Sequence, residues 1–319
     1  MPTNYNYDGL LEAALGDTRL AINDHVIDGR YSDSDLLRIL ASSFNIALTD
    51  LNTAMSKNPI YVEHTINFNT TDKEYLLPTG VNGIAQLAIP DPATGRVESL
   101  IPAFHLNELA GPNWSIVLPF LRLQMPFNRA AVGRVTFEPK AETMMHVGKL
   151  TGSTHTIAAA ATTFALSESA VQYGRFDKRP NAYIGGMLRV YKAKIPSGYL
   201  AFPVQERIVT AFSAATLTLT LNKCFDVEIS DASANEIWYE IVPLVDPGIM
   251  RLAGLEAARF LCETSTEKDK ARSLSDSYER QKIAVRRNYQ SLNQVREKAP
   301  PHPLNRIGGP IRMAGRSLT

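Results

Sequence analysis

The sequence predicts an α+β protein: a helical bundle built from both chain ends, with an inserted antiparallel β-sheet or barrel domain and an extended C-terminal arm. Near both ends, apolar residues recur at spacings of three and four, which is typical of the buried side of a helix. In the middle, apolar and polar residues alternate, which is typical of a strand. The two ends can form one bundle when an inserted region leaves and re-enters at neighbouring points.

These changes of period set the expected domain boundaries. We expect an N-terminal helical part at 1–59, a β region at 60–149 and an inserted β-barrel or sandwich module at 150–245. C-terminal helices completing the bundle follow at 246–298, and an extended arm at 299–319. With 319 residues, 45% of them hydrophobic, the chain is large enough to bury such a core.

Two helices are expected before residue 59. Leu10, Leu11, Ala14 and Leu15 predict a short helix that ends near Gly16. A second helix begins at Ser32, because a serine with an acidic residue three positions on approximates a capping box. It ends at Asn58-Pro59, since the residue before a proline avoids the helical region. Its apolar stripe comprises Leu36, Leu37, Leu40, Phe44, Ala47, Leu48, Leu51 and Met55.

The middle of the chain predicts two β regions. The first contains alternating runs and one short helical step, at 102–109. The second is rich in threonine and alanine, and its strand-like runs lie about ten to twenty residues apart, which favours a small barrel or sandwich. The first set of strands is expected at 61–68, 74–77, 85–89, 114–118 and 132–137, and the second at 163–166, 187–191, 206–211, 217–221 and 237–242.

Helical periodicity returns after Pro243. Asp246-Pro247-Gly248 is a helix start signal, with aspartate as the cap and proline in the first turn. A long helix then runs to about Lys298, with alternating spacings of three and four that predict a seam packed nearly parallel to another helix. We expect this seam to pack on the N-terminal hairpin of the same chain. Its positions are Ala271, Leu274, Tyr278, Gln281, Val285, Asn288, Leu292 and Val295.

The charge distribution is asymmetric. Residues 1–267 hold 21 basic and 28 acidic residues, whereas residues 268–319 hold 12 basic and 4 acidic residues. An acidic body with a basic C-terminal segment indicates pairing between molecules, although a solvated helix face explains the same composition. The last 21 residues contain four prolines and no acidic residue, so they form neither a helix nor a core strand. Fully extended, they reach on the order of 65 Å.

No catalytic or metal-binding motif is present. The six histidines are scattered, with no HExxH motif, and no Walker, Rossmann or nucleophile-elbow pattern occurs. Cys224 and Cys262 are expected to be buried, reduced thiols in a protein that folds in a reducing compartment. Asp226, Glu228 and Asp231 do not follow the spacing of a calcium loop and are expected to be solvated. We therefore expect no enzyme activity, cofactor or metal, and the absence of a long apolar run predicts no membrane span.

The segments 65–68, 74–78 and 83–87, which follow the capped helix containing residues 36–40, resemble the head-to-tail adaptor proteins of tailed bacteriophages, including the tail-tubular A type. The later segments 181–187, 205–211 and 214–219 resemble a β module common in phage structural proteins. The helices between residues 252 and 289 also resemble the paired closing helices of adaptors.

This resemblance implies a structural virion protein that assembles in the host cytoplasm into a ring, usually of twelve copies, under the portal protein. It implies a downstream tail, nozzle or neck protein as the next partner, and DNA that passes through the channel without specific binding. The C-terminal segment would dock on the portal. The partner-binding residues are then expected to be Arg286, Arg287, Arg296, Leu304, Arg306, Ile307, Ile311, Arg312 and Arg316.

Three alternatives remain open at this point. The chain could be another neck, tail or baseplate component that attaches fibres or a collar through its β module. Trp114, Trp238 and several tyrosines on β segments leave open a carbohydrate-binding module, although core packing explains two tryptophans better. An enzyme site assembled from residues distant in sequence would also escape a motif search.

Overall fold

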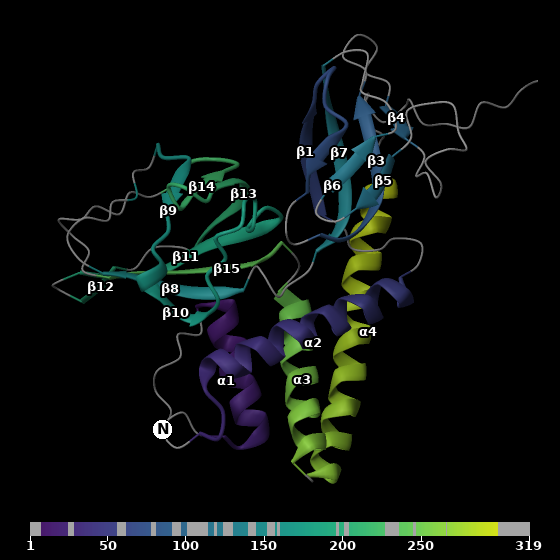
Figure 1. Cartoon of the computed structure of the whole chain (residues 1–319). Helices are drawn as coiled ribbons and strands as arrows, with labels where there is room; N and C mark the ends of the chain where they lie inside the picture. The colour runs from purple at the N-terminus through teal and green to yellow at the C-terminus, as the bar shows by residue number, and fades with distance from the viewer. Residues whose placement is uncertain are drawn as a thin grey trace, which may run out of the picture.

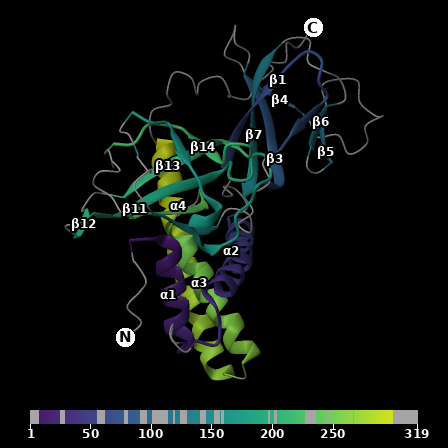
Figure 2. The ribbon, with the colours of Figure 1, turned by 60° about the vertical axis from the view of Figure 1, so that its left-hand side comes forward.

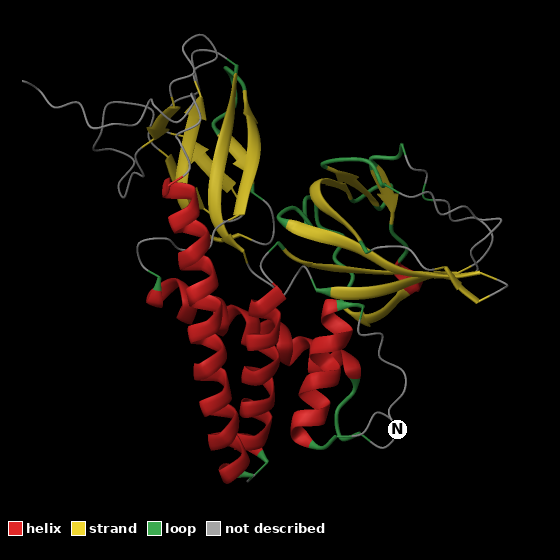
Figure 3. Cartoon of the chain, turned by 180° about the vertical axis from the view of Figure 1, so that it is seen from behind, coloured by secondary structure: helices red, strands yellow, loops and turns green. Residues whose placement is uncertain are grey.

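The computed structural model describes residues 8–24, 29–55, 62–77, 81–90, 97–100, 114–117, 120–123, 130–139, 145–151, 157, 160–195, 198–200, 204–226, 236–244, 247–265 and 267–298. Within these residues the protein is a mixed α+β structure with four helices and antiparallel sheets, as the sequence predicts. The helices lie together at one end of the molecule and the sheets at the other (Figure 1). The view from behind shows the same division (Figure 3).

The helices come from both ends of the described chain. They are α1 (Leu10–Ile22), α2 (Asp33–Ala54), α3 (Pro247–Thr264) and α4 (Lys268–Lys298). Helix α3 contacts each of the other three helices, and one hydrophobic cluster joins all four. The view turned by 60° shows α3 between its neighbours (Figure 2). Segments more than 200 residues apart in sequence therefore share one core.

Helix α1 is longer than the sequence predicts. It does not end near Gly16 but continues to Ile22, and Asn23 ends it in the left-handed conformation at φ 55°. Both Gly16 and Thr18 are buried, and the Thr18 hydroxyl donates hydrogen bonds to Ala14 O at 2.7 Å and Gly254 O at 3.3 Å. Packing against α3 thus outweighs the low helix propensity of glycine.

Helix α2 begins as predicted. The Ser32 hydroxyl oxygen accepts a hydrogen bond from Asp35 N at 3.1 Å, and the hydroxyl donates to the Asp35 carboxylate at 2.6 Å. This cap satisfies one of the backbone N–H groups that the first turn of a helix leaves unpaired. The predicted apolar stripe is buried from Leu36 to Met55, and the helix ends at Ala54, before the expected end at Asn58-Pro59.

The smaller β part is built from two sheets. The first has the strand order β1-β7-β3-β4 and the second β2-β6-β5. One core cluster takes side chains from both sheets, and within it Phe68 and Tyr75 meet edge to face at 4.6 Å. The strands are β1 (Val62–Phe68), β2 (Glu74–Leu76), β3 (Val81–Pro90), β4 (Val97–Leu100), β5 (Trp114–Val117), β6 (Phe120–Leu123) and β7 (Ala131–Pro139).

The larger β part is a curled antiparallel half-barrel. Its strand order is β10-β8-β15-β11-β13-β14-β9, and β12 pairs with β11 outside this path. The strands are β8 (His146–Thr151), β9 (Thr163–Ala165), β10 (Val171–Gly174), β11 (Gly186–Ile195), β12 (Gly198–Leu200), β13 (Gln205–Ser213), β14 (Thr218–Leu221) and β15 (Glu236–Pro243), with a 3-10 helix η2 (Glu168–Ala170) before β10.

Strand alternation assigns the two faces of this sheet to different cores. On β15, Ile237, Tyr239 and Ile241 face the interior of the half-barrel, whereas Val242 joins the helix-side core. Successive side chains of a strand point to opposite faces, so Glu240 faces the helices. The central strands are therefore buried on both faces, and any charge on their helix side needs a partner there.

All predicted strands that fall on described residues exist, and several are longer than expected, because β-ladders continue through weakly alternating residues. The strand expected at 85–89 extends to Val81–Pro90, and that at 187–191 extends to Gly186–Ile195. The helical step predicted at 102–109 lies outside the described residues. Strand β8 belongs to the larger sheet, so it crosses the expected domain boundary between residues 149 and 150.

Candidate partner-binding surface

The structure describes the side chains of only two of the nine predicted partner-binding residues. Arg286 and Arg287 lie on α4, and both are exposed. The side chain of Arg296, on the last turns of α4, lies outside the described set. The same is true of the predicted arm residues Leu304, Arg306, Ile307, Ile311, Arg312 and Arg316.

The predicted seam of α4 is buried or half-buried from Ala271 to Val285, whereas Asn288 is exposed, and the main partner of the seam differs from the expected one. Ala271, Tyr278 and Val285 are between 3% and 5% exposed. They lie on the side of α4 that packs mainly against α3, and contact with the N-terminal helix α2 is limited. Tyr278 supplies one such contact, since its hydroxyl donates a hydrogen bond to Asp50 at 3.1 Å. The short connection after Thr264 explains the difference, because it makes α3 and α4 antiparallel neighbours.

The opposite side of α4 carries an exposed apolar residue among arginines. Ile283 is 50% exposed. In a helix, residues three or four positions apart are surface neighbours, which places Arg280, Arg286 and Arg287 around Ile283. At about 100° per residue, Arg280, Ile283 and Arg287 lie on the far side of the helix from Tyr278, and Arg286 lies at the edge of this group. We call these four residues the outer face of α4.

The arginines of the outer face differ from the neighbouring Lys282 in their ion pairs. Within the described part of the chain, no carboxylate forms an ion pair with Arg280, Arg286 or Arg287. Lys282, by contrast, pairs with Glu279 at 2.6 Å and lies 4.0 Å from Asp50, on the inner flank of the helix. The outer face therefore presents three positive charges and one apolar side chain to solvent.

Sequence reasoning missed Arg280 and Ile283. The signal was present, because both residues fall between the positions of the predicted seam and so on its far side. An isolated exposed isoleucine is common on protein surfaces and predicts nothing alone. Its meaning comes from the unpaired arginines around it, which only the structure identifies.

A buried charge cluster fixes α1 on the larger sheet. The Glu240 carboxylate accepts hydrogen bonds from Leu10 N at 2.7 Å and Leu11 N at 2.9 Å, and it pairs with Arg189. It thus caps a helix N-terminus, where negative charge is favoured. Burial raises the pKa of Glu240, while Arg189 and the two N–H groups oppose that shift.

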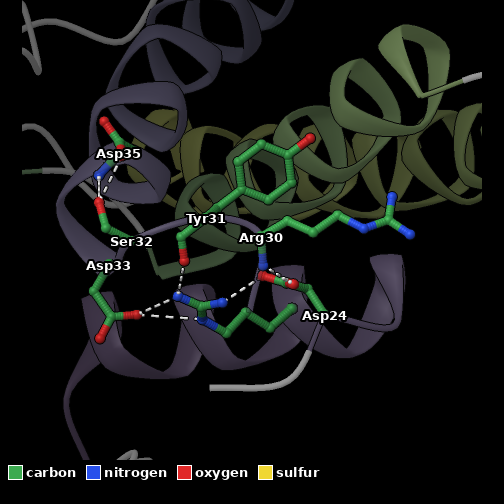
Figure 4. A network of polar contacts seen from close by, with 7 residues as sticks. Asp24, Arg30, Tyr31, Ser32, Asp33 and Asp35 are labelled. Carbon is green, nitrogen blue, oxygen red and sulfur yellow. Dashed lines mark hydrogen bonds and ion pairs between the residues drawn. The ribbon is translucent and has the colours of Figure 1, made fainter. Parts of the chain in front are cut away.

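A second buried network closes the connection between α1 and α2 (Figure 4). The Arg19 guanidinium pairs with Asp24 and with Asp33, and it donates a hydrogen bond to Tyr31 O at 2.7 Å. The other oxygen of Asp24 accepts from Arg30 N at 2.7 Å. Because these partners lie at the end of α1, in the chain between α1 and α2, and at the first residue of α2, the network joins the two helices.

His146 is the most buried titratable base described. It is fully buried among the rings of Phe176, Tyr183 and Tyr239, and neither ring nitrogen has a hydrogen-bond partner among the described residues. Burial lowers the pKa of His146 to about 3. In the native state the imidazole of His146 is therefore neutral near pH 7.

We expect the free energy of unfolding of His146→Leu to fall less between pH 7 and pH 5 than that of the wild type. Since the folded pKa lies below the unfolded value, the wild type loses stability as pH falls below about 6.5, by roughly 2 kcal/mol between pH 7 and pH 5 from this group. Urea denaturation at both pH values measures the difference. His64, whose pKa burial lowers to about 4, contributes in the same direction, so His64→Gln serves as the comparison. If the free energy of unfolding of His146→Leu depended on pH as that of the wild type does, the lowered pKa of His146 would be contradicted.

The two cysteines differ in environment. Cys262 is buried, as predicted, and burial raises the pKa of its thiol. The prediction is wrong for Cys224, which is exposed. It lies in the turn after β14, where its carbonyl rather than its thiol is engaged, accepting a hydrogen bond from Arg207 at 2.6 Å. Neither thiol forms a disulfide.

Other binding chemistries find little support in the described residues. No group of three or more metal-ligating side chains occurs among them, and none of their helices is both long and apolar enough to span a membrane. The ring of Trp238 packs against the helix-side core with Lys149 Nζ 5.2 Å from its centre, so it is not an open platform for a sugar. The outer face of α4 remains the most distinctive surface described.

Comparison of the sequence with protein-family models and with curated proteins finds no match. The function must therefore be argued from the geometry and charge of this chain.

Proposed function

We propose that this chain is a structural virion protein, a head-to-tail adaptor that forms a ring under the portal of a tailed bacteriophage and links capsid to tail. The observation that carries the proposal is the outer face of α4, a basic surface around Ile283 whose arginines form no ion pair with any residue that the structure describes. It lies on the helix that leads directly into the basic, proline-rich segment 299–319. The helix and the segment that follows it both carry a net positive charge, so both suit a single acidic partner surface.

The fold supports this role because the helical layer is braced from several sides. We infer that the helices from both chain ends form one bundle that holds α4 rigid, with α3 at its centre and Glu240 and Arg19 fixing α1. Rigid presentation lowers the entropy that a binding surface loses on docking. The β parts project from the other end of the molecule, where the next tail or neck component would bind (Figure 1).

Ring symmetry would strengthen weak individual contacts. Each outer face offers one apolar anchor and three arginines, and arginine is enriched among residues that dominate binding energy. Several copies docking on one symmetric partner bind with avidity that a single copy lacks. An acidic body would repel phosphates, which is consistent with DNA passing through the ring without specific binding.

Charge reversal on the outer face tests the proposal. We expect Arg286→Glu with Arg287→Glu to weaken binding to the portal protein of the same phage at least tenfold. Added salt should weaken wild-type binding as well, because exposed charge pairs are screened. Lys268→Glu with Arg272→Glu, two exposed positions at the start of the same helix, is the matched control. Equal affinity of both double variants in sedimentation binding assays would contradict the assignment.

Removal of the C-terminal segment tests the arm separately. We expect a chain truncated after residue 298 to keep its circular dichroism spectrum and melting temperature, and to lose portal docking, because the removed residues supply three further arginines and several apolar anchors. Unchanged docking of the truncated chain would refute the role of the arm and leave the outer face of α4 as the sole candidate.

A further inference from the structure

An open pocket of about 560 Å³ lies beside the first turns of α2, and we call it the α2 pocket. Helix α2 lines it with two rows of residues, because positions four apart share one side of a helix. The polar row is Ser34, Arg38 and Ser42, and the apolar row is Leu37 and Ala41. The volume falls within the range of sites that bind small molecules.

A second wall of the α2 pocket comes from the larger β part. It contains Met145, which precedes β8, then Gly174 at the end of β10, and Arg175. Gly174 has a φ of +94°, and a Cβ there would lie 2.6 Å from Met145 O and 2.8 Å from Leu37 Cδ2. Strand β10 can therefore end directly against α2, and the pocket joins segments more than 100 residues apart in sequence.

The floor of the α2 pocket is apolar and held in place. Leu37, Ala41 and Met145 are each no more than 5% exposed, and all three belong to the hydrophobic cluster that joins the four helices. Their positions are thus fixed by packing that the fold itself requires. A ligand that contacts this floor loses little affinity to ordering it.

The rim of the α2 pocket carries two arginines from different elements. Arg38 and Arg175 are both exposed, and Asp35 is the one acid among the described lining residues. The Asp35 carboxylate accepts a hydrogen bond from the Ser32 hydroxyl at 2.6 Å, and its exposed contact with Arg38 at 3.4 Å is worth little in water. Asp177, two positions after Arg175, pairs with Arg179 at 2.6 Å.

The combination of rim and floor selects the class of ligand. Guanidinium groups bind carboxylates with charge-assisted hydrogen bonds, and the hydroxyls of Ser34 and Ser42 are further donors. An inorganic anion would use this rim and leave the floor wet, whereas a neutral hydrocarbon would use only the floor. A ligand with a carboxylate at one end of an aliphatic body uses both.

We propose that the α2 pocket binds a small-molecule carboxylate with an aliphatic body, whose carboxylate lies at the rim with Arg38 and Arg175 and whose body covers Leu37, Ala41 and Met145. The inference goes beyond the proposed function and is independent of it, because the outer face of α4 takes no part in this site.

Isothermal titration calorimetry of the full-length chain with sodium octanoate tests the site. From butanoate to hexanoate to octanoate, we expect the affinity to rise by roughly fourfold at most for each added methylene, because each one buries apolar surface. Octylammonium and sodium phosphate, which lack the carboxylate and the aliphatic body respectively, should each bind at least tenfold more weakly than octanoate. In methyl NMR spectra, octanoate should shift the signal of Met145.

Two double variants separate the rim arginines from general charge. Arg38→Gln with Arg175→Gln should weaken octanoate binding at least tenfold and keep the wild-type melting temperature, because both positions are exposed. Arg251→Gln with Arg272→Gln, at two exposed positions on α3 and α4, should change the affinity less than twofold.

Four results would overturn the inference. They are no saturable binding of octanoate below its critical micelle concentration, phosphate that binds as tightly as octanoate, butanoate that does so, or equal affinity of the two double variants. A blocked tripeptide, acetyl-Leu-Glu-Leu-amide, distinguishes a protein ligand. If it bound the wild type more tightly than octanoate, the pocket would belong to an acidic protein segment and not to a small molecule.

Discussion

Replacing Glu240 with leucine should destabilise the protein by about 3–5 kcal/mol, because one substitution removes both the buried carboxylate that pairs with Arg189 and the cap of a helix. Arg189 is 6% exposed and would keep its charge among the helix-side residues. Leu10 N and Leu11 N would lose their acceptor at the start of α1. Glu206 would remain beside Arg189, but it is 48% exposed, and removing the buried partner of a buried charge costs much more than the original pair contributes.

Urea denaturation measures this loss as a fall in the free energy of unfolding. Glu206→Gln is the matched control, since Glu206 also pairs with Arg189, at 2.8 Å, but is 48% exposed and should contribute less than about 1 kcal/mol. If Glu240→Leu cost no more than Glu206→Gln, the buried cluster would not be what holds α1 on the sheet.

Arg19→Met should cost about as much, roughly 3–5 kcal/mol, since it keeps the aliphatic volume and leaves Asp24 buried without its cation. The side chains of Arg19 and Asp24 are 4% and 5% exposed. Asp33 and Tyr31 O lose a donor in the same change. Relative to the wild type, amide hydrogen exchange in the Arg19→Met variant should accelerate in α1 and in the first turn of α2 more than in α4.

The control for this network is Arg38→Met, which removes an arginine whose pair with Asp35 is exposed on both sides. We expect that substitution to change the free energy of unfolding by less than about 1 kcal/mol. If Arg19→Met also changed the free energy of unfolding by less than about 1 kcal/mol, the connection between α1 and α2 would be stabilised by packing alone.

Periodicity predicted the helices and strands well where one face is buried. The stripe from Leu36 to Met55 and the Ser32 cap define α2 on local signals alone. Helix α1 shows the limit of such signals, because Gly16 is a breaker in isolation and only contact with α3 keeps the helix intact. The partner of α4 was missed for the same reason, since a seam shows which side is buried and not what covers it.

The candidate surfaces depend on residues that meet across long sequence distances. Arg286 and Arg287 could be predicted from the basic C-terminal segment, whereas Ile283 matters only once its exposure is known. A pocket beside the first turns of α2 is lined by Arg38 and Arg175, two residues that no spacing rule connects. Likewise, the pairing of Glu240 with α1 joins residues about 230 positions apart.

Electron microscopy of the purified chain mixed with a portal protein, the partner that the proposed function requires, tests the central claim most directly. The account predicts a closed ring of this chain stacked on the portal, with the helical end of each copy, including α4, against the portal and both β parts directed away. A chain that stays monomeric beside free portal rings would contradict the account, as would a complex in which the β parts make the contact.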